Sequence, residues 1–123
     1  MTLGRQHLGR SGEALAEALL RTRGYRILER NYRTRIGEID LIAKDGKTLV
    51  FVEVKSRRSM RFGSAKEAVT MAKRRKLTMV ALQYLKSTAE PDVHARFDVV
   101  AIDQGGENPR LELVQNAFEM AYP

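Results

Sequence analysis

The chain has 123 residues and no cysteine, which excludes a disulfide framework and a thiolate zinc site. Its two histidines, His7 and His94, are too few for a histidine-built metal site, so carboxylate and carbonyl oxygens would have to bind any metal. Such ligands favour a hard ion such as Mg²⁺ or Mn²⁺. The formal net charge of +7 suits a polyanionic partner, although a basic surface also keeps proteins soluble.

The length fits one domain, residues 1–123, with its own hydrophobic core. No apolar run approaches the roughly 20 residues that span a bilayer. The basic segment 1–12 is not followed by the apolar stretch of a signal peptide. We therefore expect a cytoplasmic protein with no membrane partner.

The first predicted element is a helix. Ser11 is expected to cap it, and Gly24 is expected to end it. Its apolar positions recur at helical spacing and are Ala14, Leu15, Ala18 and Leu19.

Strands are expected over residues 25–32, 36–44 and 47–56. A long helix over residues 64–86 and strands over 97–102 and 111–114 follow. The order helix, three strands, helix, two strands favours an α/β fold, with layers around one mixed sheet of about five strands.

A hairpin is predicted between the second and third strands, because Asp45-Gly46 lies between two strand-like runs. A two-residue turn at these positions pairs Lys44 with Lys47. Asp40 and Glu53 then become diagonal neighbours on one face. That face also carries Glu38 and Lys55, and the opposite face would carry the apolar side chains Ile39, Leu41, Val50, Val52 and Val54.

Asp40, Glu53 and Lys55 are charged residues in strands that otherwise resemble buried ones. Charges in such places are paired, bind metal or line a cleft, because burying an unpaired charge costs several kcal/mol. Two carboxylates at this spacing suit a divalent cation, with the carbonyl of Val54 as a third ligand. Lys55 would then hold the attacking water or the phosphate during hydrolysis of a phosphodiester. The alternative is a structural ion pair between Lys55 and the two acids; the grouping of all three favours a functional site.

Basic residues gather in the loop after the third strand and on the long helix. The candidate phosphate contacts are Arg57, Arg58, Arg61, Lys73, Arg74 and Lys76. Lys73 and Lys76 border the apolar stripe of the helix and are placed to reach the sheet, whereas Arg74 is expected to face solvent or phosphate. A run of charges is also common on a solvated helix face.

Two other acids are left out of the predicted ligand set. Glu38 either supports the ligands or pairs with an arginine such as Arg33 or Arg35. Asp98 lies in a buried strand and is interpreted as a structural partner of a lysine or arginine.

The segments Gly37-Glu38-Ile39-Asp40 and Phe51-Val52-Glu53-Val54-Lys55-Ser56-Arg57 resemble the YraN family. That family is related to archaeal Holliday-junction resolvases in the PD-(D/E)XK, or restriction-endonuclease-like, superfamily. The resemblance extends over most of the chain. It implies a restriction-endonuclease-like three-layer fold and a Mg²⁺- or Mn²⁺-dependent endonuclease acting on DNA, with branched DNA as one possible substrate. It also admits a homodimer, since a junction has two cleavage points.

The resemblance assigns roles residue by residue. Asp40 matches the aspartate of the first motif, and Glu53 and Lys55 match the acidic residue and lysine of the second. Glu13 matches the glutamate of the N-terminal helix that joins the metal site in the resolvase-like branch. From the residues alone, Glu13 would only stabilise the first turn of its helix.

The resemblance also concerns two lysines outside the motifs and one departure from the superfamily pattern. Lys73 and Lys76 sit where related enzymes carry a further basic or polar active-site residue. Ile39 departs from the pattern, because proline precedes the aspartate in the superfamily's name. The competing interpretation is a catalytically silent nucleic-acid-binding module with a nuclease fold, and the intact set Asp40, Glu53 and Lys55 argues against it.

Overall fold

The computed structural model describes residues 2–57, 69–88 and 93–120, with side chains from residue 12 onward. The elements within these ranges are α1 (Thr2–Thr22), β1 (Arg26–Arg33), β2 (Glu38–Asp45), β3 (Thr48–Arg57), α2 (Met71–Thr88), β4 (Ala95–Asp103) and β5 (Arg110–Phe118). The strands form one sheet in the order β1-β2-β3-β4-β5, parallel between β3 and β4 and antiparallel elsewhere. The predicted α/β class, element order and mixed five-stranded sheet are confirmed for the described residues.

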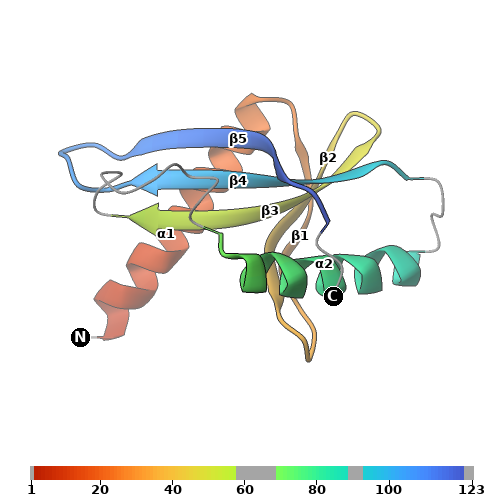
Figure 1. Cartoon of the computed structure of the whole chain (residues 1–123). Helices are drawn as coiled ribbons and strands as arrows, with labels where there is room; N and C mark the ends of the chain where they lie inside the picture. The colour runs from red at the N-terminus through yellow and green to blue at the C-terminus, as the bar shows by residue number, and fades with distance from the viewer. Residues whose placement is uncertain (1, 58–68, 89–92, 121–123) are drawn as a thin grey trace.

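The two helices lie on opposite sides of the sheet, which gives three layers (Figure 1). The cluster on the α1 side includes Leu20, Tyr25, Leu41, Val50, Val52 and Val100. The cluster on the α2 side includes Ile42, Phe51, Val80, Tyr84, Phe97 and Val99. Both faces of β3 and β4 are therefore buried, as expected for strands paired in parallel. Each fully buried side chain of this size contributes roughly 1.5–3 kcal/mol.

Helix α1 packs closely on the sheet through small residues. Gly12, Ala16 and Leu20 are its buried positions, one helical turn apart, whereas Ala14 and Ala18 are exposed. A Cβ atom at Gly12 would lie 2.9 Å from the Ser56 Oγ atom on β3, so the glycine permits this approach. The predicted apolar stripe was partly right, because Leu15 and Leu19 pack against the cluster on this side, whereas Ala14 and Ala18 do not.

The ends of α1 differ in how well they were predicted. The helix begins at Thr2, so Ser11 lies inside it and is not its cap. Gly24 ends it as expected, with a φ angle of +86°. The N–H of Tyr25 donates to the carbonyl of Leu20 and that of Gly24 to the carbonyl of Arg21, which is a Schellman motif.

The β2–β3 hairpin has a different register from the predicted one. Asp45 pairs with Thr48, so the turn is Gly46-Lys47, and Gly46 has a φ angle of +62°. A positive φ at the first of two turn residues is the arrangement of a type II′ turn. The pairing is therefore shifted by two residues, and a shift of two does not by itself move a side chain to the other face.

One apolar residue of β2 departs from strict alternation. Leu41 packs under α1, but Ile39, two residues earlier, packs under α2. The prediction that both lie on one face was wrong. Opposite them on β1, Asn31 has a φ angle of +52°, and this irregular residue lies where the two sides exchange.

Helix α2 begins at Met71, after Thr70, whose Oγ1 atom accepts a hydrogen bond from the Lys73 N–H at 3.2 Å. Residues 69 and 70 are not helical, so the predicted helix was too long at its start; residues 64–68 lie outside the described residues. Leu77, Val80 and Tyr84 face the sheet as expected. Among the described residues, neither helix combines the length and apolar character needed to cross a bilayer.

A buried polar network ties β4 to the start of β1. Asp98 is fully buried and accepts hydrogen bonds from Tyr25 Oη at 2.7 Å, from Arg96 Nε at 3.0 Å and from the N–H of Asn116 at 2.9 Å. Arg96 also pairs with Asp45 at 2.7 Å. The prediction that Asp98 has a structural basic partner is confirmed.

Candidate functional site

Asp40 and Glu53 face each other across the β2–β3 pair. The last backbone pair of this hairpin is Leu41 with Val52, so the next residues in register are Asp40 and Glu53. They are therefore directly opposite and not diagonal, which brings the carboxyl groups closer than predicted. The Oδ2 atom of Asp40 accepts a hydrogen bond from the N–H of Val54 at 2.8 Å, which fixes its carboxyl group against β3.

The two carboxyl groups form an acid pair that retains a proton. Burial raises the pKa of Asp40 to about 8, with further contributions from a hydrogen bond with Glu53 and from the charge of Glu53. The hydrogen bond from Val54 and the charge of Lys73 oppose this rise. Near neutral pH the pair therefore carries less negative charge than two independent carboxylates.

Glu53 is the most buried acid of the site. Its side chain is 6% exposed, and its Oε2 atom has no hydrogen-bond partner among the described residues. Lys73 Nζ, from the first turn of α2, lies 3.7 Å from this oxygen, so the two groups form an ion pair without a hydrogen bond. The cation beside Glu53 is thus Lys73 and not the Lys55 of the structural alternative.

Glu13 borders the acid pair from α1. With the Asn31 amide oriented so that its nitrogen faces the two acids, that nitrogen donates to Glu13 Oε1 at 3.1 Å and to Glu38 Oε1 at 3.0 Å. Burial raises the pKa of Glu13, Asp40 and Glu38 raise it further by charge, and the hydrogen bond from Asn31 opposes them. Glu13 is therefore close enough to Asp40 to be influenced by its charge.

Asn31 is a residue that sequence reasoning missed. Asparagine is uncommon inside strands and tolerates positive φ, which was the available signal. Glu38 also pairs with Arg33 at 3.5 Å, which supports one of the two roles considered for it.

Lys55 and the carbonyl of Val54 lie at the same stretch of β3. Lys55 is half-buried and, two residues beyond Glu53, projects on the same side of the sheet. The N–H of Val54 points toward Asp40, and the carbonyl of a strand residue points to the same side as its N–H. The Val54 carbonyl is thus directed toward the acid pair.

The predicted phosphate contacts are spread over several places. Lys73 reaches the acid pair, but Lys76 is exposed and does not form an ion pair among the described residues. Arg74 does not face solvent as expected: its Nε atom donates to the carbonyl of Val69 at 2.9 Å, and its guanidinium lies 5.0 Å from the Phe118 ring centroid. Arg57 ends β3 half-buried. Arg58 and Arg61 lie outside the described residues.

The donor set fits a divalent cation in part. Within the described ranges, no three Asp, Glu or His side chains are grouped closely enough to hold a metal together. Two opposed carboxyl groups, one buried oxygen without a partner and a nearby carbonyl are oxygen ligands of the kind that Mg²⁺ and Mn²⁺ prefer. The groups that could hold a divalent cation are therefore Asp40, Glu53 and the carbonyl of Val54, with Glu13 at the edge of the site.

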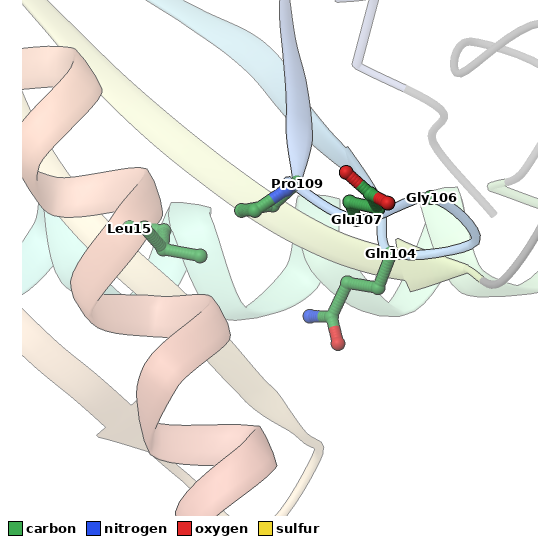
Figure 2. A pocket seen from close by; sticks show the side chains of 5 residues that line it. All are labelled: Leu15, Gln104, Gly106, Glu107 and Pro109. Atoms are coloured by element: carbon green, nitrogen blue, oxygen red, sulfur yellow. The ribbon is translucent and has the colours of Figure 1, made fainter.

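A separate pocket of about 270 Å³ lies between α1 and the turn that joins β4 to β5. Figure 2 shows Leu15 projecting from the helix toward this turn, and Gln104, Gly106, Glu107 and Pro109 also line the pocket. Leu15 follows Glu13 by two residues and so points away from it around the helix. The pocket contains none of the candidate acids.

Comparison with known proteins identifies the family. The model of an uncharacterised protein family, UPF0102, matches residues 12–102. The chain belongs to this family. It is 48% identical over 122 residues to a UPF0102 protein of Geobacter metallireducens, covering 99% of this chain and 100% of the relative.

Two further relatives give the same result. A UPF0102 protein of Desulfosudis oleivorans is 53% identical over 115 residues, covering 94% of this chain and 92% of the relative. A UPF0102 protein of Syntrophus aciditrophicus is 51% identical over 114 residues, covering 93% and 90%. The YraN-like membership inferred from the sequence is confirmed, and the region matched by the UPF0102 model includes Glu13, Asp40, Glu53, Lys55 and Lys73.

Proposed function

We propose that this protein is a metal-dependent endonuclease that hydrolyses phosphodiester bonds in DNA, with Mg²⁺ or Mn²⁺ held by Asp40 and Glu53. The observation that carries the proposal is the opposed acid pair, in which a buried Glu53 oxygen has no hydrogen-bond partner in the described part of the chain. Such a pair is stable with a proton or with a cation, because two bare carboxylates would repel each other in a poorly hydrated place.

The surrounding residues have complementary roles in this proposal. A bound divalent cation would lower the pKa of a coordinated water and neutralise charge on the phosphate. Lys55, beside Glu53 on the same side of the sheet, donates a hydrogen bond to the attacking water or to a phosphate oxygen. The Val54 carbonyl completes the ligand set, and Asn31 holds Glu13 at its margin.

The resemblance described above supports the class of substrate. The YraN family's relation to junction resolvases, and a three-layer α/β fold of the expected element order, agree with a restriction-endonuclease-like enzyme. Branched DNA is accordingly the proposed substrate, and a homodimer would supply the two active sites that a junction needs. The net charge of +7 suits contact with phosphates.

The test is cleavage of labelled junction, flap, duplex and single-stranded DNA in Mn²⁺ or Mg²⁺. Asp40→Asn and Lys55→Met are expected to lower the cleavage rate by at least about 100-fold with folding intact. Glu112→Gln and Lys47→Met remove exposed charges elsewhere and serve as matched controls that should cut normally. Binding without cutting on every substrate, unchanged by either site variant, would reject the nuclease and favour a silent binding module.

A further inference from the structure

The amino-terminal end of α2 carries an electrostatic conflict. Residues 73–76 are all cationic and the first turn has no acid, although the positive end of a helix dipole favours anions. The first N–H groups of a helix also lack acceptors within it, and here Thr70 satisfies that of Lys73. Thr70, Met71 and Ala72 are exposed, so this end of the helix opens to solvent. Conflicts of this kind are retained mainly at functional sites.

Lys73 is the cation of this turn that faces the acid pair. Its Nζ atom lies 3.7 Å from Glu53 Oε2, the buried oxygen for which residues 2–57, 69–88 and 93–120 provide no hydrogen-bond partner. Its side chain is 42% exposed, so the ammonium group has room to turn toward solvent. Arg74, the next residue, is instead engaged with the Val69 carbonyl and the Phe118 ring. The long ion pair is therefore the adjustable contact at this end of α2.

We propose that the first turn of α2 is a phosphate subsite, and that its lysine, Lys73, changes partner when the metal site is filled. Lys73 neutralises Glu53 when no divalent cation is bound, and it holds a phosphate of the nucleic acid once a cation has replaced it there. The inference rests on the proposed function and deepens it by assigning the order in which charges enter the site. The helix N–H groups contribute to the same phosphate, as they do at other helix starts.

The exchange follows from the charges involved. If Lys73 turned to a phosphate with no metal bound, Glu53 would be left as an uncompensated carboxylate beside that phosphate, and the two anions would repel each other. A cation on Glu53 removes that repulsion and releases the ammonium of Lys73 for the phosphate. Metal and phosphate should therefore strengthen each other's binding by the same factor.

Removing the charge of Lys73 has effects of opposite sign on the two ligands. The metal loses a competitor for Glu53 and should bind about threefold more tightly, the size expected for a partly exposed ion pair. The phosphate loses a charged donor and should bind about tenfold more weakly. A lysine that only stabilised the fold would weaken both.

Calorimetric titrations can measure both effects without any cleavage. The probes are Mn²⁺ and thymidine 5′-monophosphate, which carries a phosphate group but no phosphodiester bond to cut. Each is titrated with and without the other into the wild-type chain and into the variants Lys73→Met, Lys73→Arg and Lys86→Met. Lys86 is an exposed lysine in the last turn of the same helix, far from the acid pair, so its variant is the matched control. Circular dichroism checks that every variant is folded.

The expected result is mutual strengthening in the wild type and in Lys86→Met. In Lys73→Met, Mn²⁺ binds more tightly and the nucleotide more weakly, and Lys73→Arg restores nucleotide binding. Mn²⁺ binding with no change in nucleotide affinity, or a Lys73→Met variant that weakens both ligands, would overturn the subsite while leaving the nuclease proposal standing. Absence of Mn²⁺ binding to the wild type would overturn both.

Discussion

Replacing Asp40 by asparagine should stabilise the metal-free protein at high pH. The pKa of Asp40 is raised from 3.8 to about 8 in the folded state, so between these values the folded chain holds a proton that the unfolded chain releases. The unfolding free energy of the wild type therefore falls as pH rises from about 4 to about 8, by up to about 1.4 kcal/mol per pH unit. Asparagine resembles the protonated acid, does not titrate, and can still accept the hydrogen bond from Val54.

The magnitude follows from the same rise in pKa. Taken in full, it corresponds to about 5–6 kcal/mol at 1.36 kcal/mol per pKa unit. Relaxation of the site and entry of water reduce the effective penalty of a buried charge, so we expect about 2–3 kcal/mol between Asp40→Asn and the wild type at pH 8.5. At pH 4 the two proteins should have nearly equal stability.

Urea unfolding at several pH values, in buffer containing a chelator, measures this difference directly. Glu112→Gln, which removes an exposed acid from β5, should follow the wild-type curve. Saturating Mn²⁺ should stabilise the wild type, by about 2.7 kcal/mol at a concentration 100 times the Kd, but not Asp40→Asn. If the unfolding free energies of the wild type and Asp40→Asn changed in parallel with pH, the raised pKa of Asp40 would be refuted.

Three other substitutions test the fold that supports the site. Gly12→Val should lower the unfolding free energy by about 1–3 kcal/mol in urea, because its side chain would overlap Ser56, and Gly12→Val with unchanged stability would contradict the close packing of α1. Asp98→Ala should cost about 3–5 kcal/mol, because Tyr25 Oη and the Asn116 N–H lose their buried acceptor and Arg96 keeps only Asp45 as an acidic partner; a loss below 1 kcal/mol would argue against that network. Arg75→Gln should raise the unfolding free energy slightly, by about 0.3–0.5 kcal/mol in urea at low salt, because it removes a cation from the positive end of α2; destabilisation would contradict the conflict described there.

The two acids could be predicted from the sequence because an error of two residues in the hairpin register does not change which face a side chain occupies. The turn was placed two residues from its actual position, yet Asp40 and Glu53 stayed on one side, since a shift of two preserves the face of every residue. The shift changed only their relation, from diagonal to opposite. An error of one residue in the register would have placed the two acids on opposite faces of the sheet.

Other parts of the site could not be read from local patterns. The contact between Lys73 and Glu53 joins residues 20 positions apart on different elements, and local periodicity does not say which elements pack against each other. The exchange of sides at Ile39 accompanies the positive φ angle of Asn31, and strand patterns assume regular backbone. The orientation of α1 depends on the close approach of Gly12 to Ser56, and a search for apolar side chains at helical spacing does not include glycine.

The single parallel contact in the sheet has a consequence for how the site is assembled in time. Residues 2–57 contain α1 and two antiparallel pairings of nearby strands, and this half also holds Glu13, Asp40, Glu53 and Lys55. The pairing of β3 with β4 joins positions more than 40 residues apart, such as Glu53 with Val99, and so closes a long loop that forms slowly. Glu53 gains its central, buried position only with that closure. The early half of the chain can therefore bring the acids together, but the site acquires its dry interior only when β4 docks.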